Sequence, residues 1–463
     1  MTSSIRTCWR DLRGIAGRAI WVLCSSCGLH GERTRRSGRV SEVISSAGVS
    51  QIKILLHFQK PSERERMVCL LLEGLVKLLE PVRIGRHLLK NRIVMAPLAR
   101  ARGDERRAPK DIVGTYYSQR ATAGLIVTEA CHVSPTSATR ARATANHDAH
   151  QTLAWKQVVD AVHAAGGVIF QQIYHVGRKS LLSGMPNGQV PVAPSAIAAY
   201  GGIMKEDGLE EFPVPRALAL HEIAPIVEDH RQAVRRAGEA GFDGVEILAG
   251  NGFLIDQFLR DSTNKRTDSY GGSKENRARF LFEVVDAAIA ELGADRVGVR
   301  LSPHFRADHI DDSDPVGTFS YVVSELDRRG IAFIHLLEGT SYDNSGDIPL
   351  YQRLVKKPSA GGGGAGPRSG EPFLAPILRP LFRGALILNS GYTRDSAEQA
   401  VRSGAADAIS FGRLYISNPD LPERFRLNAP LTEPDTATYY TNGPEGYIDY
   451  PSLGDRVAQV PAA

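Results

Sequence analysis

Eight short apolar runs recur along the chain, and longer segments with helical patterns separate them. Each run is nearly continuous in apolar residues, which is typical of a parallel strand that is buried on both faces. This alternation constrains the fold more than any other feature of the sequence. The runs are Arg92–Leu98, Gly124–Ala130, Gly167–Tyr174, Gly244–Leu248, Val297–Pro303, Ala332–Glu338, Ala385–Gly391 and Ala408–Leu414.

The segments between the runs carry the periodicity of amphipathic helices. In His221–Ala240 and Asn276–Leu292 the apolar side chains fall on one stripe. Gly241 stands where a glycine commonly closes a helix. Strands and helices that alternate over about 375 residues predict a single α/β domain, a (β/α)8 barrel of the TIM type. A doubly wound sheet is the alternative, but it would need a glycine-rich turn after an early strand, and none follows Leu98 or Ala130.

Composition excludes several classes of protein. The 463 residues are 42% hydrophobic and 23% charged, as in ordinary globular proteins. No apolar run reaches the roughly 18–20 residues that a membrane-spanning helix needs, so no membrane partner is expected. The net charge of +5 gives no reason to expect a nucleic-acid partner. Only Cys131 lies beyond Cys69, which favours a reducing, cytoplasmic compartment over a disulfide scaffold.

The first 66 residues differ in character from the rest. They hold twelve Lys/Arg and five Asp/Glu, a balance of +7, so the remainder of a chain with net charge +5 carries −2. We interpret residues 1–66 as a disordered or wrongly annotated basic extension, and residues 67–463 as the domain, with a core at about 79–453. Targeting to an organelle is the alternative, because the segment is rich in Arg and Ser. Cys24 and Cys27 lack a second pair at zinc-ribbon spacing, so no metal site is expected.

Two connections interrupt the regular alternation. Residues 176–219 form a long link after the third strand, rich in Gly, Pro and Ser, and a link of this length is usually a lid or a binding loop. Gly361–Gly364 is a low-complexity stretch between the sixth and seventh strands, which we expect to be flexible. The helical pattern resumes near Pro372–Phe382.

The ends of the last two strands carry residues suited to a phosphate. In a barrel of this kind the active site lies at the carboxyl ends of the strands, and the loops after the seventh and eighth commonly bind phosphate. Asn389, Ser390 and Gly391 end the seventh strand, and Gly412 and Arg413 end the eighth. Glycines expose backbone N–H groups, and an arginine offers a charged fork. Alternatively, the two glycines only turn the chain.

Polar residues also lie on or after the third, fourth and fifth strands. Gln172 lies near the end of the third strand and Arg300 on the fifth. An inward arginine is costly unless it meets an anion or a strong acceptor, and a neighbouring carboxylate is the alternative partner. Asn251 follows the fourth strand, where its amide can donate to a ligand oxygen, although an Asn-Gly pair more often forms only a turn.

Taken together, these residues resemble the Old Yellow Enzyme family of FMN-dependent ene-reductases over about residues 79–453. The most specific stretch runs from Asn251 to Arg260 and continues through 264–268, 270–273 and 275–277. The other matching motifs are Arg92–Leu98, Gln172–Arg178, Phe411–Arg413, Asn418–Pro422 and Glu445–Pro451.

The resemblance implies a tightly but non-covalently bound FMN. Gln172 would bond the pyrimidine edge of the flavin, and Arg300 would stabilise negative charge on the reduced ring. Pro97 and Ala130 would flank the flavin. Gly391, Gly412 and Arg413 would hold its phosphate, and Asn389 at the end of the seventh strand is a further cofactor-binding residue.

The reaction that the resemblance implies has two halves. NAD(P)H reduces the flavin and leaves, and the reduced flavin then gives hydride to the β-carbon of an alkene that is conjugated to a carbonyl or nitro group. The partner is therefore a small enone-type substrate, and the protein is expected to be a monomer or a homodimer.

The chain departs from the family pattern where the substrate binds. The family places a histidine three residues before His or Asn, whereas this chain has Leu248 before Asn251. The position of the proton-donating tyrosine is Phe253, which has no proton to give. Three further positions carry a changed or pocket-lining residue: Ala99, where Thr or Cys tunes the flavin, Tyr174, where Trp is common, and Tyr440, which matches a tyrosine of the substrate pocket.

Three functions are consistent with these departures. The first is an NAD(P)H- and FMN-dependent ene-reductase with an altered donor site. The second is a flavin-dependent isomerase or tailoring enzyme of secondary metabolism, for which a missing proton donor is no obstacle. The third is a non-catalytic FMN-binding protein. The main expectation is the ene-reductase, with Leu248, Asn251, Phe253 and Tyr440 at the substrate.

Overall fold

The computed structural model describes residues 76–137, 140–205, 208–338 and 370–454, and the backbone of two short strands before them. These are β1 (Val22–Cys24) and β2 (Ile52–Ile54), which pair antiparallel. The chain divides into two compact units, residues 1–75 and residues 76–463. The predicted disorder of residues 1–66 falls, apart from the two strands, outside the described residues, and so does the flexible stretch Gly361–Gly364.

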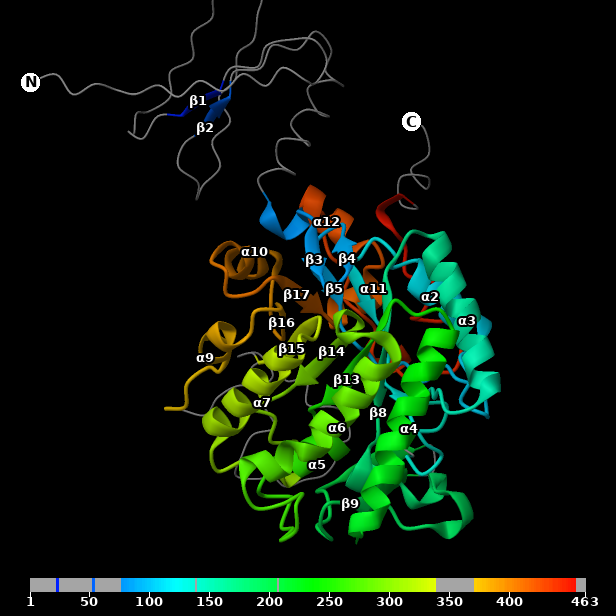
Figure 1. Ribbon diagram of the computed structural model, residues 1–463. Helices are drawn as coiled ribbons and strands as arrows, with labels where there is room; N and C mark the ends of the chain where they lie inside the picture. The colour runs from blue at the N-terminus through cyan, green and yellow to red at the C-terminus, as the bar shows by residue number, and fades with distance from the viewer. Residues whose placement is uncertain are drawn as a thin grey trace, which may run out of the picture. The chain divides into compact units, whose positions relative to one another are not determined.

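Eight parallel strands of the second unit close into a barrel (Figure 1). In ring order they are β5 (Ile93–Met95), β6 (Leu125–Val127), β8 (Ile169–Tyr174), β13 (Gly244–Ala249), β14 (Val297–Leu301), β15 (Phe333–Leu337), β16 (Ala385–Asn389) and β17 (Ala408–Phe411). β17 pairs back with β5, and β8 pairs with β13. The short strand β7 (Cys131–His132) adds to the end of β8. This closure confirms the predicted (β/α)8 barrel and excludes the doubly wound sheet, which has open edges.

The apolar runs in the sequence have a direct physical cause. Every residue of the eight barrel strands is buried, because one face of each strand meets the helices and the other fills the barrel. Inside the barrel, the rings of Phe170 and Phe333 occupy the space that side chains on neighbouring strands would need. A Cβ atom at Gly244 would lie 2.4 Å from the Phe170 ring, and one at Gly298 would lie 2.2 Å from the Phe333 ring. These two glycines therefore let the aromatic layer close.

A hairpin closes the amino end of the barrel. Its strands are β3 (Val82–Ile84) and β4 (His87–Leu89), which pair antiparallel. The buried side chains of both strands belong to the apolar cluster that contains Phe170 and Phe333. Because apolar side chains fill this end of the barrel, a polar site can form only at the opposite, carboxyl end.

Helices surround the barrel in the order in which they follow the strands (Figure 1). The predicted helices at 221–240 and 276–292 are confirmed within two residues, as α4 and α6, and Gly241 follows α4 with a φ of +90°. The helices are α2 (Asp111–Ser118), α3 (Ala149–Ala164), α4 (Leu220–Glu239), α5 (Leu254–Leu259), α6 (Lys274–Leu292), α7 (Pro315–Arg329), α9 (Ala375–Leu378), α10 (Arg394–Arg402), α11 (Arg413–Ser417) and α12 (Leu421–Leu427).

The long link after β8 is built from short elements. Its 3-10 turn at Gly177–Lys179 follows the strand directly, and β9 (Val192–Ala193) pairs parallel with β12 (Arg216–Ala217). A hairpin of β10 (Gly202–Lys205) and β11 (Gly208–Glu211) projects from it. Its role as a lid stays a prediction. No helix among the described residues is long and apolar enough to cross a membrane.

Candidate active site

A chain of buried polar side chains crosses the interior of the barrel near its carboxyl end. Gln172 on β8 donates through Nε2 to Oε1 of Glu246 on β13, at 2.6 Å. The other oxygen of Glu246 lies 2.7 Å from Nδ1 of His335 on β15. All three side chains are at most 2% exposed. The carboxylate of Glu246 therefore fixes the orientation of the Gln172 amide.

The same chain continues to the strands that end at the predicted phosphate loops. The Arg300 Nη1 atom on β14 lies 2.6 Å from Nε2 of His335, and its Nη2 atom donates to Oδ1 of Asn389 at 2.8 Å. Asn389 on β16 donates through Nδ2 to the carbonyl of Ser410 on β17, at 2.9 Å. One network thus joins six strands and holds three of the predicted cofactor residues, Gln172, Arg300 and Asn389.

His335 is neutral in this network. Burial, and then the positive charge of Arg300, lower the pKa of His335 to about 4, although Glu246 opposes the shift. Because a carboxylate only accepts, Nδ1 must carry the imidazole proton toward Glu246, which leaves Nε2 as an acceptor. Arg300 is then the positive charge of this network, and two of its partners are the neutral side chains of His335 and Asn389.

The ends of β16 and β17 place two of the predicted phosphate residues in special backbone conformations. Ser390 has a φ of +98° and Gly391 a φ of +72°. A positive φ at a serine is strained, and such strain concentrates at functional turns. Gly412 precedes α11, where a Cβ atom would lie 3.2 Å from Leu98, and the neighbouring Arg413 side chain is exposed.

An apolar cluster lies beyond the ends of β8 and β13. The buried side chains of Tyr174, Val176 and Leu248 form it, and the half-buried Ala130 and Phe253 pack against them. The Phe253 ring meets the Tyr174 ring edge-on, with centroids 4.9 Å apart. The structure thus brings together Leu248 and Phe253, the two residues that replace family donors. Neither of these two side chains can donate a hydrogen bond.

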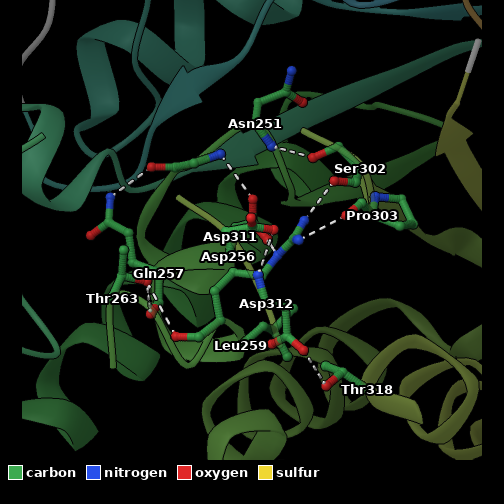
Figure 2. Close-up of polar contacts among 12 residues, drawn as sticks. Asn251, Asp256, Gln257, Leu259, Thr263, Ser302, Pro303, Asp311, Asp312 and Thr318 are labelled. Carbon is green, nitrogen blue, oxygen red and sulfur yellow. Dashed lines mark hydrogen bonds and ion pairs between the residues drawn. The ribbon is translucent and has the colours of Figure 1, made fainter. Parts of the chain in front are cut away.

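Asn251 is held beside this cluster by its backbone. Its N–H donates to Oγ of Ser302 at 2.6 Å, and the next N–H, of Gly252, donates to Oδ2 of Asp256 at 2.9 Å. Asn251 has a φ of +58°, a conformation that asparagine tolerates better than most residues. Figure 2 shows its side-chain amide pointing away from Ser302 and from the carboxylates below. The bonds that hold the turn therefore do not use the side-chain amide of Asn251.

The turn at Asn251 rests on a buried ion pair. Asp256 and Arg260 on and after α5 are both fully buried and lie 2.8 Å apart. Arg260 also donates to the carbonyls of Ser302 and Pro303, at 2.6 and 2.8 Å. Because this pair ties α5 to the end of β14, it fixes the Asn251 turn from both sides.

The remaining predicted site residues occupy more exposed positions. Pro97 is half-buried and Ala99 is exposed, in the segment after β5. Tyr440 is 48% exposed, and its described ring contacts are with the Arg140 guanidinium at 4.1 Å and with Tyr439. These positions agree with an open rim, and their roles stay predictions.

Sequence reasoning missed four residues that the geometry places at the site. Glu246, His335 and Ser410 belong to the polar network, and Lys179 lies against Phe253. Glu246 and His335 interrupt apolar strands, and this interruption was the available signal. Lys179 directly follows the matched motif that ends at Arg178, so the motif did not include it. The only signal in the sequence was a positive charge shortly after a predicted strand.

The comparisons with known proteins agree with this geometry. Residues 77–432 match the NADH:flavin oxidoreductase / NADH oxidase family. The chain belongs to this family.

Relatives of known name cover most of the chain. 12-oxophytodienoate reductase 1 of Oryza sativa subsp. japonica is 42% identical over 381 residues, which is 82% of this chain and 93% of that protein. A probable flavin mononucleotide-dependent alkene reductase of Leishmania infantum is 41% identical over 381 residues, 81% of this chain and 97% of that protein.

Solved structures show the same barrel. Morphinone reductase in complex with tetrahydroNAD is 43% identical, with a TM-score of 0.73, over 81% of this chain and 97% of that one. The old yellow enzyme homologue from Zymomonas mobilis is 42% identical, with a TM-score of 0.74, over 81% of this chain and all of that one. The chain is thus a flavin oxidoreductase of the Old Yellow Enzyme type, with FMN as its cofactor and NAD(P)H as its co-substrate.

The residues on hand fit FMN. The amide of Gln172 and the guanidinium of Arg300 offer donors for the oxygens and nitrogens of a flavin pyrimidine ring. Both side chains belong to the same hydrogen-bond network. The strained Ser390–Gly391 turn and the exposed Arg413 suit a phosphate. Among the described residues, no group of three or more His, Cys, Asp or Glu side chains is placed to hold a metal ion.

Proposed function

We propose that this chain uses NAD(P)H and FMN to reduce the C=C bond of alkenes that are conjugated to a carbonyl or nitro group. The family match and the relatives named as alkene and 12-oxophytodienoate reductases support this activity. The observation that carries the proposal is the polar network from Gln172 through Arg300 to Asn389, which supplies the donors that a flavin ring requires.

Each part of the network has a proposed task. Bound FMN supplies the hydride chemistry, accepting hydride from NAD(P)H and passing it to the β-carbon of the alkene. Gln172 is oriented by Glu246 to bond the pyrimidine edge. Arg300 places its charge where the reduced ring becomes negative, and the His335 that it contacts adds no second positive charge. Arg413 holds the phosphate.

The substrate would lie against the apolar cluster of Tyr174, Leu248 and Phe253. This surface removes water from the reacting carbons, and the Asn251 amide donates to the oxygen of the activating group. Pro97 and Ala130 flank the ring, and Ala99 and Tyr440 border the opening. An apolar wall in place of a donor favours a bulky apolar substrate over a small polar one.

We further propose that the catalytic unit begins near residue 67 and acts in the cytoplasm as a monomer or a homodimer. The family match starts at residue 77, and the compact second unit starts at residue 76. Cys131, buried within the barrel unit, suits a reducing compartment.

Anaerobic spectroscopy of the purified protein tests the function. We expect a yellow protein whose flavin absorption bleaches on addition of NADPH or NADH and returns when 2-cyclohexenone is added without oxygen. A product analysis should find cyclohexanone in amounts equal to the reductant consumed. A protein that is colourless after reconstitution with FMN, or that bleaches but is never reoxidised by any conjugated alkene, would contradict the proposal.

A further inference from the structure

A lysine ammonium lies directly against the substituted donor site. Lys179 belongs to the 3-10 turn that follows β8, and its side chain is only 12% exposed. Its Nζ atom lies 4.8 Å from the centroid of the Phe253 ring and 5.6 Å from that of Phe305. A buried lysine is expensive in free energy, so its partners indicate what holds it there.

Two acceptors fix the position of the ammonium. Nζ donates to Oδ2 of Asp308 at 2.5 Å and to the backbone carbonyl of Asn251 at 3.3 Å. Asp308 is itself 6% exposed and sits in a short 3-10 turn after β14. An ammonium has three N–H groups, so one remains after these two bonds. Within the described residues, the other contacts of Nζ are the two aromatic rings.

The ammonium is bonded to the backbone of the turn that carries the Asn251 side chain. Lys179 bonds the carbonyl of the same residue whose side-chain amide faces away from the protein network (Figure 2). Phe305 packs over the following glycine, since a Cβ atom at Gly252 would lie 3.2 Å from its ring. The cationic donor on the turn after β8 is thus bonded to the backbone of the turn that carries the neutral Asn251 amide, and it lies over the ring of Phe253.

We propose that Lys179 is the second donor to the substrate oxygen, in place of the side chain that Leu248 lacks. This inference rests on the function proposed above. Asn251 and Lys179 together would bind the oxygen of the activating carbonyl or nitro group. Substrates whose oxygen becomes strongly negative, and phenolate ligands, would be favoured over neutral ones.

The chemistry of the step explains why a cation matters. When hydride reaches the β-carbon, the electron pair of the C=C bond moves to the α-carbon and onto the carbonyl oxygen, which gives an enolate. The enolate oxygen meets N–H groups from Asn251 and Lys179, and a proton from water then adds to the α-carbon. NAD(P)H supplies the two electrons. A positively charged donor forms a stronger hydrogen bond to such an oxygen than a neutral donor does.

Lys179→Met tests the proposal, because methionine keeps much of the stem and removes the charge. The FMN-loaded variant is titrated with 4-hydroxybenzaldehyde at a pH where it is a phenolate, and its reduced form is mixed anaerobically with 2-cyclohexenone. We expect binding to weaken and reoxidation to slow, each by about 10–100-fold. Lys179→Arg should restore most of both.

Lys156→Met is the matched control. Lys156 also pairs with an aspartate, Asp160 at 2.8 Å, but on the exposed surface of α3. The control should leave phenolate binding and reoxidation unchanged. Phenolate affinity of Lys179→Met within about twofold of the wild type, with FMN retained, would overturn the inference.

Asp308→Asn keeps the test decisive if Lys179→Met loses FMN. Asparagine tolerates the φ of +64° at this position and removes the charge that competes with the ligand. Phenolate binding should then tighten several-fold, and unchanged or weaker binding would contradict the proposal. If instead the wild type bleaches with NADPH but no alkene reoxidises it, the proposed function fails, whereas normal turnover with an unaffected Lys179→Met defeats only this inference.

Discussion

The two sides of the active site are built on different principles. On the cofactor side, Gln172, Arg300 and Asn389 belong to one hydrogen-bonded network that crosses six strands. On the substrate side, Leu248 and Phe253 form an apolar wall, and Asn251 presents an amide beside it. The first side keeps the polar residues that the family resemblance implies for the flavin, whereas the second carries Leu248 and Phe253 in place of two family donors.

The difference between the two sides shows how well each one tolerates substitution. A buried polar network tolerates little change, because removing one member leaves its partners unsatisfied at a cost of about 1–3 kcal/mol. An apolar wall formed by single side chains at strand ends has no such coupling. The cofactor side therefore fixes what the protein carries, and the substrate side is free to determine what it acts on.

Restoring the missing donor should have the largest effect. Leu248→His would place an N–H group near the substrate oxygen, and one oxyanion donor is worth about 10²–10³ in rate. We expect reoxidation of the reduced flavin by cyclohexenone to accelerate roughly 10²-fold, and phenolates to bind more tightly. Stopped-flow reoxidation measures this. An unchanged or slower rate with FMN bound would mean that Leu248 shapes the pocket for a bulky substrate, or that Lys179 already supplies the second donor.

Removing a cofactor contact should have the next largest effect. Arg413→Ala would remove a charge-assisted phosphate bond, and Arg300→Ala would remove the positive charge of the network. Each should lower FMN affinity about tenfold or more. Fluorescence of FMN released on dilution gives the dissociation constant. If both alanine variants retain FMN as the wild type does, the cofactor side has been assigned to the wrong residues.

Acid should act on the cofactor side through His335. The pKa of His335 is lowered from 6.5 to about 4, so between these values the unfolded chain takes up a proton that the folded chain does not. The stability that neutral His335 contributes is thus present above pH 6.5 and is lost as the pH falls, by up to about 1.4 kcal/mol per unit. Urea unfolding should show a shallower pH slope in His335→Gln. Equal slopes in both proteins would show that His335 is not the titrating group.

Adding the family's proton donor should give a smaller gain. Phe253→Tyr would supply an O–H group beside Tyr174, but water already provides the proton in our mechanism. We expect a few-fold increase in the reoxidation rate, which is below the roughly 10²-fold at the low end of general acid catalysis. A solvent isotope effect that appears only in the variant would support the assignment. A slower reaction would mean that the apolar ring, rather than a proton, is what this position contributes.

The smallest effect is expected from removing residues 1–66, which belong to neither side of the active site. A chain that begins at Met67 should retain its fold and its flavin, because the compact unit starts at residue 76 and the family match at residue 77. Thermal unfolding and FMN content of the shortened and full chains check this. A shortened chain that is insoluble or colourless, beside a yellow full chain, would place residues 1–66 in the domain.

The fold could be read from the sequence because barrel strands are buried on both faces. All eight predicted runs contain a strand, and the ends differ by a few residues, as at 124–130, where β6 is only Leu125–Val127. Apolarity continues past the last ladder bond, so it does not mark where a strand stops. The internal structure of the link at 176–219 was not predictable, because its short strands pair only with one another.

Site residues that belong to a sequence motif could be predicted. Residues that join the site only through contacts in the fold could not. Gln172, Arg300 and Asn389 were identified singly, but nothing in the sequence showed that Glu246 and His335 connect them. Lys179 and Asp308 are 129 positions apart, and only the closed barrel brings them together. Ion pairs between different strand ends depend on ring order, which periodicity does not encode.

The support of the Asn251 turn has a consequence for how such a protein diversifies. The turn is fixed by Ser302, Asp256 and Arg260, and none of these bonds involves the side chain of residue 248 or 253. Selection can therefore exchange the groups that face the substrate while the frame beneath them stays constant. A lineage can pass from one set of substrates to another by single replacements, each of which leaves a folded, cofactor-loaded ancestor for the next step.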